Sequence, residues 1–193
     1  AQVILDVNDG THSMRIVFTG DFGRKGLPVL RDPDPLPKCD VLITESTYGD
    51  RLHPSRDELK GQIRDFIEEQ RGRGGRILIP AFSVGRTQNV LWYLGNLIHD
   101  GVIDPLPIYV DSPLSSKATA IVARHRDLYD QETRDILASG RNPFFFKGVR
   151  CVADVEESKS LNALRAGIII SASGMCEGGR ILHHLEQTIG RPE

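Results

Sequence analysis

The chain has 193 residues, 39% hydrophobic and 26% charged, a balance that excludes a disordered, collagen-like or coiled-coil protein. No apolar run approaches the roughly 20 residues of a membrane helix, and no basic segment followed by an apolar one opens the sequence, so we expect a cytoplasmic protein without membrane contact. The net charge is -2, so any contact with nucleic acid must come from a local cluster of arginines.

The first fifty residues predict strands. Apolar runs extend from Val3 to Val7, from Met14 to Thr19 and from Val41 to Thr44. Asn8-Asp9-Gly10, between the first two runs, is a hairpin signal.

From Ser55 the apolar spacing becomes helical. Ser55 is a suitable N-cap, and the glycines of 72–75 end a helix predicted over 55–70. Strands and helices then alternate, with strands at 76–80, 107–110, 150–153 and 167–171 and helices at 87–99, 115–129, 156–166 and 178–189. Runs such as "ILIP" and "GIIIS" lack polar alternation, as in strands covered on both faces. The pattern predicts an α/β layer with a mainly parallel sheet.

Polar residues gather where the predicted strands end. The segments are "FTGDFGR", "ITESTYGDR", "IPAFSVGRTQ", "VDSPLSS" and "SASGMCEGGR". Ligands of open α/β sheets bind at the carboxyl ends of the strands, so these segments predict one polar cleft.

Asp21 and Glu45 are the carboxylates that directly end apolar strands. Taken singly, each fits a local role as well as a functional one: Asp21 would form an Asx-turn with the amides of Phe22 and Gly23, and Glu45 would cap its own turn. Because the two carboxylates occupy matching strand ends, the pair favours a metal or acid-base role.

Cysteine and histidine do not complete a zinc site in this sequence. Cys39, Cys151 and Cys176 are far apart, so they predict reduced thiols rather than a disulfide framework or a thiolate site. His183 and His184 are neighbours on a predicted helix and point about 100° apart, so they cannot both bind one ion.

The "SASGMCEGGR" segment opens the last predicted helix, and free amides at a helix start suit a phosphate. A structural tight turn would use the same glycines. Arg86 and Arg180 would add local positive charge there, or each would lie on a solvated helix face.

In this order, the five segments resemble the β-CASP branch of metallo-β-lactamase-fold nucleases, which includes ribonuclease J and the endonuclease subunit of the cleavage and polyadenylation specificity factor. "FTGDFGR" is similar to the fourth metallo-β-lactamase motif, and "ITESTYGDR" is similar to β-CASP motif A. The other three segments resemble further landmarks of the β-CASP domain.

The resemblance implies an α/β fold in which residues 1–49 form the end of a metallo-β-lactamase-type β-sandwich. Residues 50–193 would form most of a β-CASP domain, with a mainly parallel sheet flanked by helices. The family's HxHxDH motif would precede Ala1, and its motif B histidine and last zinc-binding histidine would follow Glu193. The chain is thus expected to be an internal piece that is inactive alone.

The resemblance also implies RNA phosphodiester hydrolysis with two zinc ions in the intact protein. Asp21 would bridge both metals, and Glu45 would orient the motif B histidine. Arg86, Ser112, Ser173 and Gly174 would line the RNA cleft. The expected partners are RNA and either a second copy or an RNA-processing complex. Two alternatives are a phosphate-binding module without hydrolysis and a non-catalytic scaffold subunit, although a scaffold has no need of Asp21 and Glu45.

Overall fold

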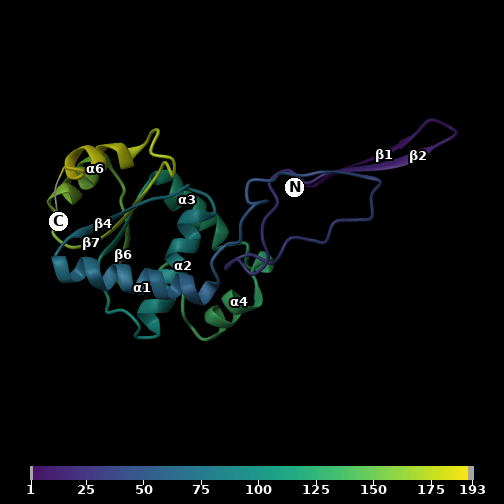
Figure 1. Cartoon of the computed structure of the whole chain (residues 1–193). Helices are drawn as coiled ribbons and strands as arrows, with labels where there is room; N and C mark the ends of the chain where they lie inside the picture. Colours follow the sequence, from purple (N-terminus) through teal and green to yellow (C-terminus); the bar gives the residue numbers. More distant parts are fainter. Residues whose placement is uncertain (1, 191–193) are drawn as a thin grey trace.

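A computed structural model describes residues 2–190, which form two sheets at different ends of the chain (Figure 1). The amino-terminal sheet has three strands, and its first two strands form a long hairpin that projects from the rest of the molecule. The second sheet has four strands with helices packed around it. Among the described residues, no helix has the length and apolar character needed to cross a membrane.

The amino-terminal sheet has the order β1 (Val3–Asn8), β2 (Ser13–Phe18) and β3 (Val41–Ile43). β1 and β2 are antiparallel, and β2 and β3 are parallel. The predicted hairpin is confirmed: a carboxylate oxygen of Asp9 accepts hydrogen bonds from the amides of Thr11 and His12, at 2.8 and 2.7 Å.

Apolar side chains lie on both faces of this sheet and are widely exposed. Val7 is 50% exposed and Leu42 is 47% exposed, whereas Val17 is fully buried. A sheet with two apolar faces suits packing against a further layer, as the expected β-sandwich requires. The sandwich itself and the domain boundary after residue 49 stay predictions.

The second sheet consists of β4 (Arg76–Pro80), β5 (Ile108–Asp111), β6 (Val149–Cys151) and β7 (Gly167–Ser171). Its order is β4-β7-β5-β6, and all three pairings are parallel, which confirms the predicted parallel sheet. All four strands therefore end at the same edge.

Six α-helices surround the four-stranded sheet in the described part of the chain. They are α1 (Arg56–Arg73), α2 (Arg86–His99), α3 (Pro113–Val122), α4 (Gln131–Ala138), α5 (Val155–Ser160) and α6 (Arg180–Thr188). Two hydrophobic cores lie against this sheet, and Ile168 and Ile170 belong to the larger one together with residues from α1, α2 and α4. Ile169 belongs to the smaller core together with Val152 and Leu161. Successive side chains of β7 are thus buried on opposite faces of the sheet.

The start of α1 follows the sequence prediction. The Ser55 hydroxyl accepts from the Glu58 amide at 3.2 Å, and the Glu58 carboxylate accepts from the Ser55 amide at 2.7 Å. This reciprocal capping satisfies two backbone donors that the helix leaves unpaired.

Three predicted helices need correction. The helix expected over 115–129 ends at Val122, and a 3₁₀ turn follows at Arg126–Leu128. The helix expected over 156–166 is α helical only to Ser160 and continues as a 3₁₀ turn, Leu161–Ala163. The last helix begins at Arg180 rather than at 178, because Gly179 has a φ of 81° that an α-helix does not accept.

Helix α4 was not predicted. It has eight residues, of which Thr133 and Ile136 are buried, so the sequence offers too few apolar positions for a helical period. The Asp130 side chain caps it by accepting from the Thr133 amide at 2.7 Å. The indole N–H of Trp92, a core residue of α2, donates to the Thr133 hydroxyl of α4 at 3.0 Å. Tertiary contacts of this kind stabilise a helix that its own sequence barely specifies.

Candidate active site

Asp21 and Glu45 follow the ends of two neighbouring parallel strands. Phe18 of β2 pairs with Ile43 of β3, and the Thr19 amide donates to the Ile43 carbonyl at 3.0 Å. Beyond this point the Phe22 amide donates to a carboxylate oxygen of Glu45 at 3.4 Å. The sheet register therefore brings the two carboxylate-bearing turns together.

The local alternative for Asp21 is not supported by the geometry. The Phe22 amide, which an Asx-turn would use, donates to Glu45 instead. Asp21 is exposed, and no hydrogen bond or ion pair within residues 2–190 engages its side chain. The Asp21 carboxylate therefore remains open to a ligand.

The carboxylate of Glu45 is held in its charged form. Hydrogen bonds from the hydroxyl and amide of Thr47 and from the amide of Phe22 hold the pKa of Glu45 below its ordinary value. The Thr47 amide lies 3.3 Å from Glu45 Oε2, so Glu45 also caps its own turn, as the local interpretation predicts. The Glu45 carboxylate thus caps its own turn and also lies beside the turn that carries Asp21.

A pocket of about 590 Å³ lies beside this pair. Phe22 and Glu45 line it from the amino-terminal region, and Arg86 lines it from the start of α2. The pocket thus joins the carboxylate turns to the loop that follows β4. Of the predicted cleft residues, Arg86 lines this pocket together with Glu45, whereas Ser112, Ser173 and Gly174 do not line it.

Ser112 ends up largely buried, at 6% exposure. Its hydroxyl caps α3 by accepting from the Ser115 amide at 3.2 Å and lies 3.4 Å from the Ser83 hydroxyl. Ser112 thus has a structural role at the end of β5, and its predicted contact with RNA stays a prediction.

Ser173 and Gly174 lie in the loop that follows β7. The Ser173 hydroxyl accepts from the Met175 amide at 3.2 Å, and the Ser173 amide donates to the Gly178 carbonyl at 3.0 Å. A Cβ on Gly174 would lie 3.0 Å from the Phe82 amide nitrogen, so glycine lets this loop approach the loop after β4. The two loops are packed together at the carboxyl edge of the sheet.

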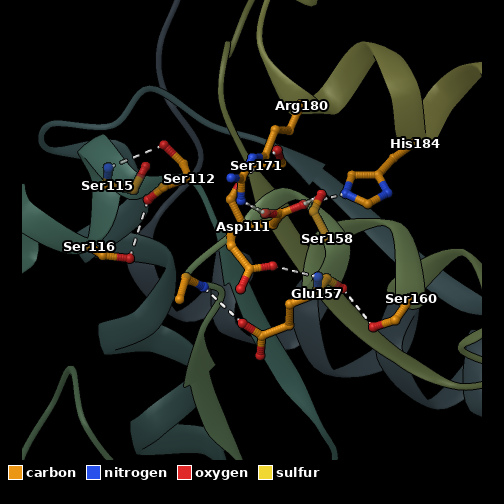
Figure 2. A network of polar contacts seen from close by, with 12 residues as sticks. Asp111, Ser112, Ser115, Ser116, Glu157, Ser158, Ser160, Ser171, Arg180 and His184 are labelled. Atoms are coloured by element: carbon orange, nitrogen blue, oxygen red, sulfur yellow. Dashed lines mark hydrogen bonds and ion pairs between the residues drawn. The ribbon is translucent and has the colours of Figure 1, made fainter.

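Asp111 is the centre of a buried polar network that the sequence did not reveal (Figure 2). Its carboxylate lies 2.6 Å from Nε2 of His184 and accepts hydrogen bonds from Arg180 at 2.6 Å and from Ser158 at 2.5 Å. Its carbonyl accepts from the Ser171 hydroxyl at 2.8 Å. The network therefore joins the ends of β5 and β7 to helices α5 and α6.

The electrostatics of Asp111 reflect a balance of two effects. Burial alone would raise its pKa, but hydrogen bonds from His184, Ser158 and Arg180 outweigh it and hold the pKa below the ordinary value. Arg180 is only 20% exposed in its side chain and is neutralised by Asp111. It is thus neither the free positive charge nor the solvated side chain considered from the sequence.

A signal for this network was present in the sequence. Asp111 ends the apolar run of β5 just as Asp21 follows that of β2. Arg180 and His184 are four residues apart on α6, so they share one helix face. His184 is 2% exposed, whereas the His183 side chain is 78% exposed, in agreement with their expected divergence.

Residues 2–190 contain no group of three or more His, Cys, Asp or Glu side chains arranged to hold a metal ion. Asp21 and Glu45 offer carboxylate oxygens, but protein zinc sites take three or four protein ligands. The described residues therefore fit part of a metal site and not a whole one.

Comparisons with known proteins identify the family. Residues 87–193 match the model of the Beta-Casp domain. The chain is 35% identical over 178 residues to a ribonuclease of Thermus thermophilus, covering 92% of this chain and 41% of that protein. It is 33% identical over 197 residues to the transcription termination factor FttA of Methanothermobacter thermautotrophicus, covering 100% of this chain and 30% of the relative.

A eukaryotic relative shows the same similarity. The chain is 34% identical over 170 residues to the endoribonuclease ysh1 of Schizosaccharomyces pombe, covering 86% of this chain and 22% of that protein. The chain belongs to the β-CASP family, as its motifs predicted. It spans less than half the length of these relatives.

Proposed function

We propose that the protein of which this chain is part hydrolyses phosphodiester bonds in RNA, with Asp21 and Glu45 in its active site. The observation that carries the proposal is the adjacency of these carboxylate-bearing turns at the ends of β2 and β3, beside a pocket that Arg86 also lines. The ribonuclease names of two relatives support the choice of RNA. The cytoplasm is its proposed location, and a homodimer or an RNA-processing complex its proposed assembly.

Two zinc ions are the proposed cofactor of the intact protein. The unengaged carboxylate of Asp21 suits a metal ligand, and further ligands would come from parts of the protein beyond this sequence. Bound zinc would supply an activated water and charge neutralisation at the scissile phosphate. Because the described residues hold only part of such a site, we propose that this chain alone is inactive.

The remaining cleft residues have distinct proposed tasks. Arg86 would bind the RNA backbone through its guanidinium, which can contact a phosphate at two oxygens. Ser173 and Gly174 would border the backbone from the loop after β7. Ser112 would line the RNA cleft from the end of β5, where its buried hydroxyl also caps α3.

The test is cleavage of a labelled single-stranded RNA by the intact protein before and after treatment with a zinc chelator. We expect cleavage, its loss on chelation and its return with added zinc. Cleavage that is indifferent to the chelator would contradict the zinc assignment. RNA binding with no cleavage under any of these conditions would favour the non-catalytic alternatives.

A further inference from the structure

Residues 26–33, in the long connection between β2 and β3, reach the turn before α4 (Figure 1). We call this segment the strap. Its Leu30 forms an antiparallel bridge with Tyr129. Two backbone hydrogen bonds of 3.0 Å flank the bridge, from the Arg31 amide to the Leu128 carbonyl and from the Asp130 amide to the Val29 carbonyl. The strap thus pairs with the α/β part of the molecule as a short strand would.

The strap is the hydrogen-bonded joint between the two parts of the chain. Within residues 2–190, no other hydrogen bond and no ion pair connects residues 2–49 with residues 50–190. The covalent connection over residues 44–55 is exposed throughout. Parts that are joined only by an exposed connection move relative to one another. The strap is therefore the contact that fixes their arrangement.

Val29 anchors the strap in the larger hydrophobic core. Its side chain is 2% exposed and packs with core residues of the α/β part. Its φ is 83°, a left-handed conformation that is strongly disfavoured for a β-branched residue. Such a conformation persists only where the surrounding structure holds it, and it is concentrated at positions that serve function. The core contact and the flanking hydrogen bonds therefore hold Val29 in one place.

The strap lies between two turns that the proposed function assigns to the active site. A pocket of about 360 Å³ beside it is lined by Gly23, two residues after Asp21, and by Gly85, directly before Arg86. Residues 27–33 line the same pocket. The strap is thus continuous with the Asp21 turn and adjoins the start of α2. Release of the strap would change where the Asp21 turn lies relative to Arg86.

We propose that Val29 is a positioning residue for the proposed RNA hydrolysis. Docked in the α/β core, it holds the Asp21 turn opposite Arg86, so that one RNA strand contacts both parts of the protein at once. Only the fraction of the protein with a docked strap then binds RNA across both parts. The proposal rests on the proposed function for its reaction, and it adds the segment that sets the geometry between the two parts.

Hydrogen exchange of the intact protein measures docking directly, because the amides of Arg31 and Asp130 donate across the joint. Val29→Ala removes two buried methyl groups and should speed exchange at both amides by about tenfold. Val29→Ile keeps a buried β-branched side chain, has room in the pocket that Val29 lines, and should exchange nearly as the parent does. The matched control is Val152→Ala, at a 1% exposed valine of the smaller core, and it should leave both amides unchanged.

A second measurement couples the strap to RNA without cleavage. The intact protein carrying Asp21→Asn is followed by hydrogen exchange with and without a single-stranded RNA. RNA that contacts both parts favours the docked strap, because coupling between two sites is reciprocal. We expect the RNA to slow exchange at the two joint amides by about 5-fold or more.

Steady-state cleavage separates positioning from stability. Val29→Ala should raise KM for RNA by the factor by which the docked fraction falls and keep kcat, since saturating RNA restores docking. Partial unfolding would instead lower kcat at an unchanged KM. Asp32→Ala loosens the strap from outside the core, because Asp32 is exposed and accepts from the Gly26 amide at 2.7 Å. It should also raise KM, whereas Asp32→Asn keeps an acceptor oxygen and should not.

Three results would overturn the proposal. They are unchanged exchange at the joint amides in Val29→Ala, exchange that RNA does not slow, and a lower kcat at unchanged KM in both Val29→Ala and Asp32→Ala. If the unsubstituted protein does not cleave RNA, yet RNA slows exchange at the joint, the positioning role of the strap stands and the proposed hydrolysis fails.

Discussion

Oδ2 of Asp111 lies 2.6 Å from Nε2 of His184, although the two residues are 73 positions apart in the chain. Asp111 is fully buried and His184 is 2% exposed. Because Asp111 ends β5 and His184 lies on α6, this contact fastens the helix that follows β7 to the neighbouring strand. Loss of the carboxylate should therefore disturb the loop that carries Ser173 and Gly174.

The first prediction concerns the stability that Asp111 provides. Asp111→Asn should lower the free energy of unfolding by about 3 kcal/mol or more, because Arg180 then keeps a largely buried charge without its partner. Ser158→Ala removes only one neutral donor and should cost about 1 kcal/mol. Urea unfolding followed through the single tryptophan, Trp92, measures both. Equal losses in the two variants would contradict the charge-based account.

The second prediction is the pH dependence of that contribution. The pKa of Asp111 lies below its ordinary 3.8, so folding favours the charged form. Its contribution is complete above pH 3.8 and is lost as the pH falls through the lower folded-state pKa. The stability difference between the unsubstituted protein and Asp111→Asn should shrink as the pH falls below 4. A difference that grows on acidification would disagree with this sign.

The third prediction compares two adjacent glycines before α6. Gly179 has a φ of 81°, and a Cβ there would collide with the Ala172 carbonyl oxygen. Gly178 has open space around its Cβ position. Gly179→Ala should therefore destabilise the protein by at least about 1 to 3 kcal/mol, while Gly178→Ala should have little effect. Thermal unfolding of both variants checks the difference, and a benign Gly179→Ala would mean that this loop is more adaptable than its geometry indicates.

The fourth prediction addresses the contact between α2 and α4. The Trp92 indole donates to the Thr133 hydroxyl, and both residues are fully buried. Thr133→Val keeps the shape but leaves the indole N–H unpaired, so it should cost about 1 to 3 kcal/mol. Thr133→Ser keeps the hydroxyl and should lose less. Chemical unfolding ranks the variants, and the reverse order would assign the site to packing alone.

The sequence predicted the features that depend on neighbouring residues. The Ser55 cap, the hairpin at Asp9 and the strands over 76–80 and 167–171 all arise from local patterns, and the structure confirms them. Asp21 and Glu45 were identifiable because each follows a short apolar strand. Their adjacency depends on the parallel pairing of β2 with β3, which no local pattern specifies.

The features that were missed depend on contacts between distant segments. Helix α4 has few apolar residues and is fixed by Trp92 from α2. Asp111 and His184 each looked ordinary alone, since a buried histidine and a strand-end carboxylate are individually common. The order of strands β5 and β7 brings them together, so their contact with each other could be recognised only from the fold.

The most direct measurement of the central claim is the rate of RNA cleavage by the intact protein under single-turnover conditions. Asp21→Asn and Glu45→Gln should each lower the rate by at least about 100-fold, as expected for groups that serve the reacting centre. Asp34→Asn is the matched control, because Asp34 is an exposed carboxylate outside the pocket beside Glu45, and it should retain the full rate. An unchanged rate in Asp21→Asn would contradict the assignment of this strand end as the active site.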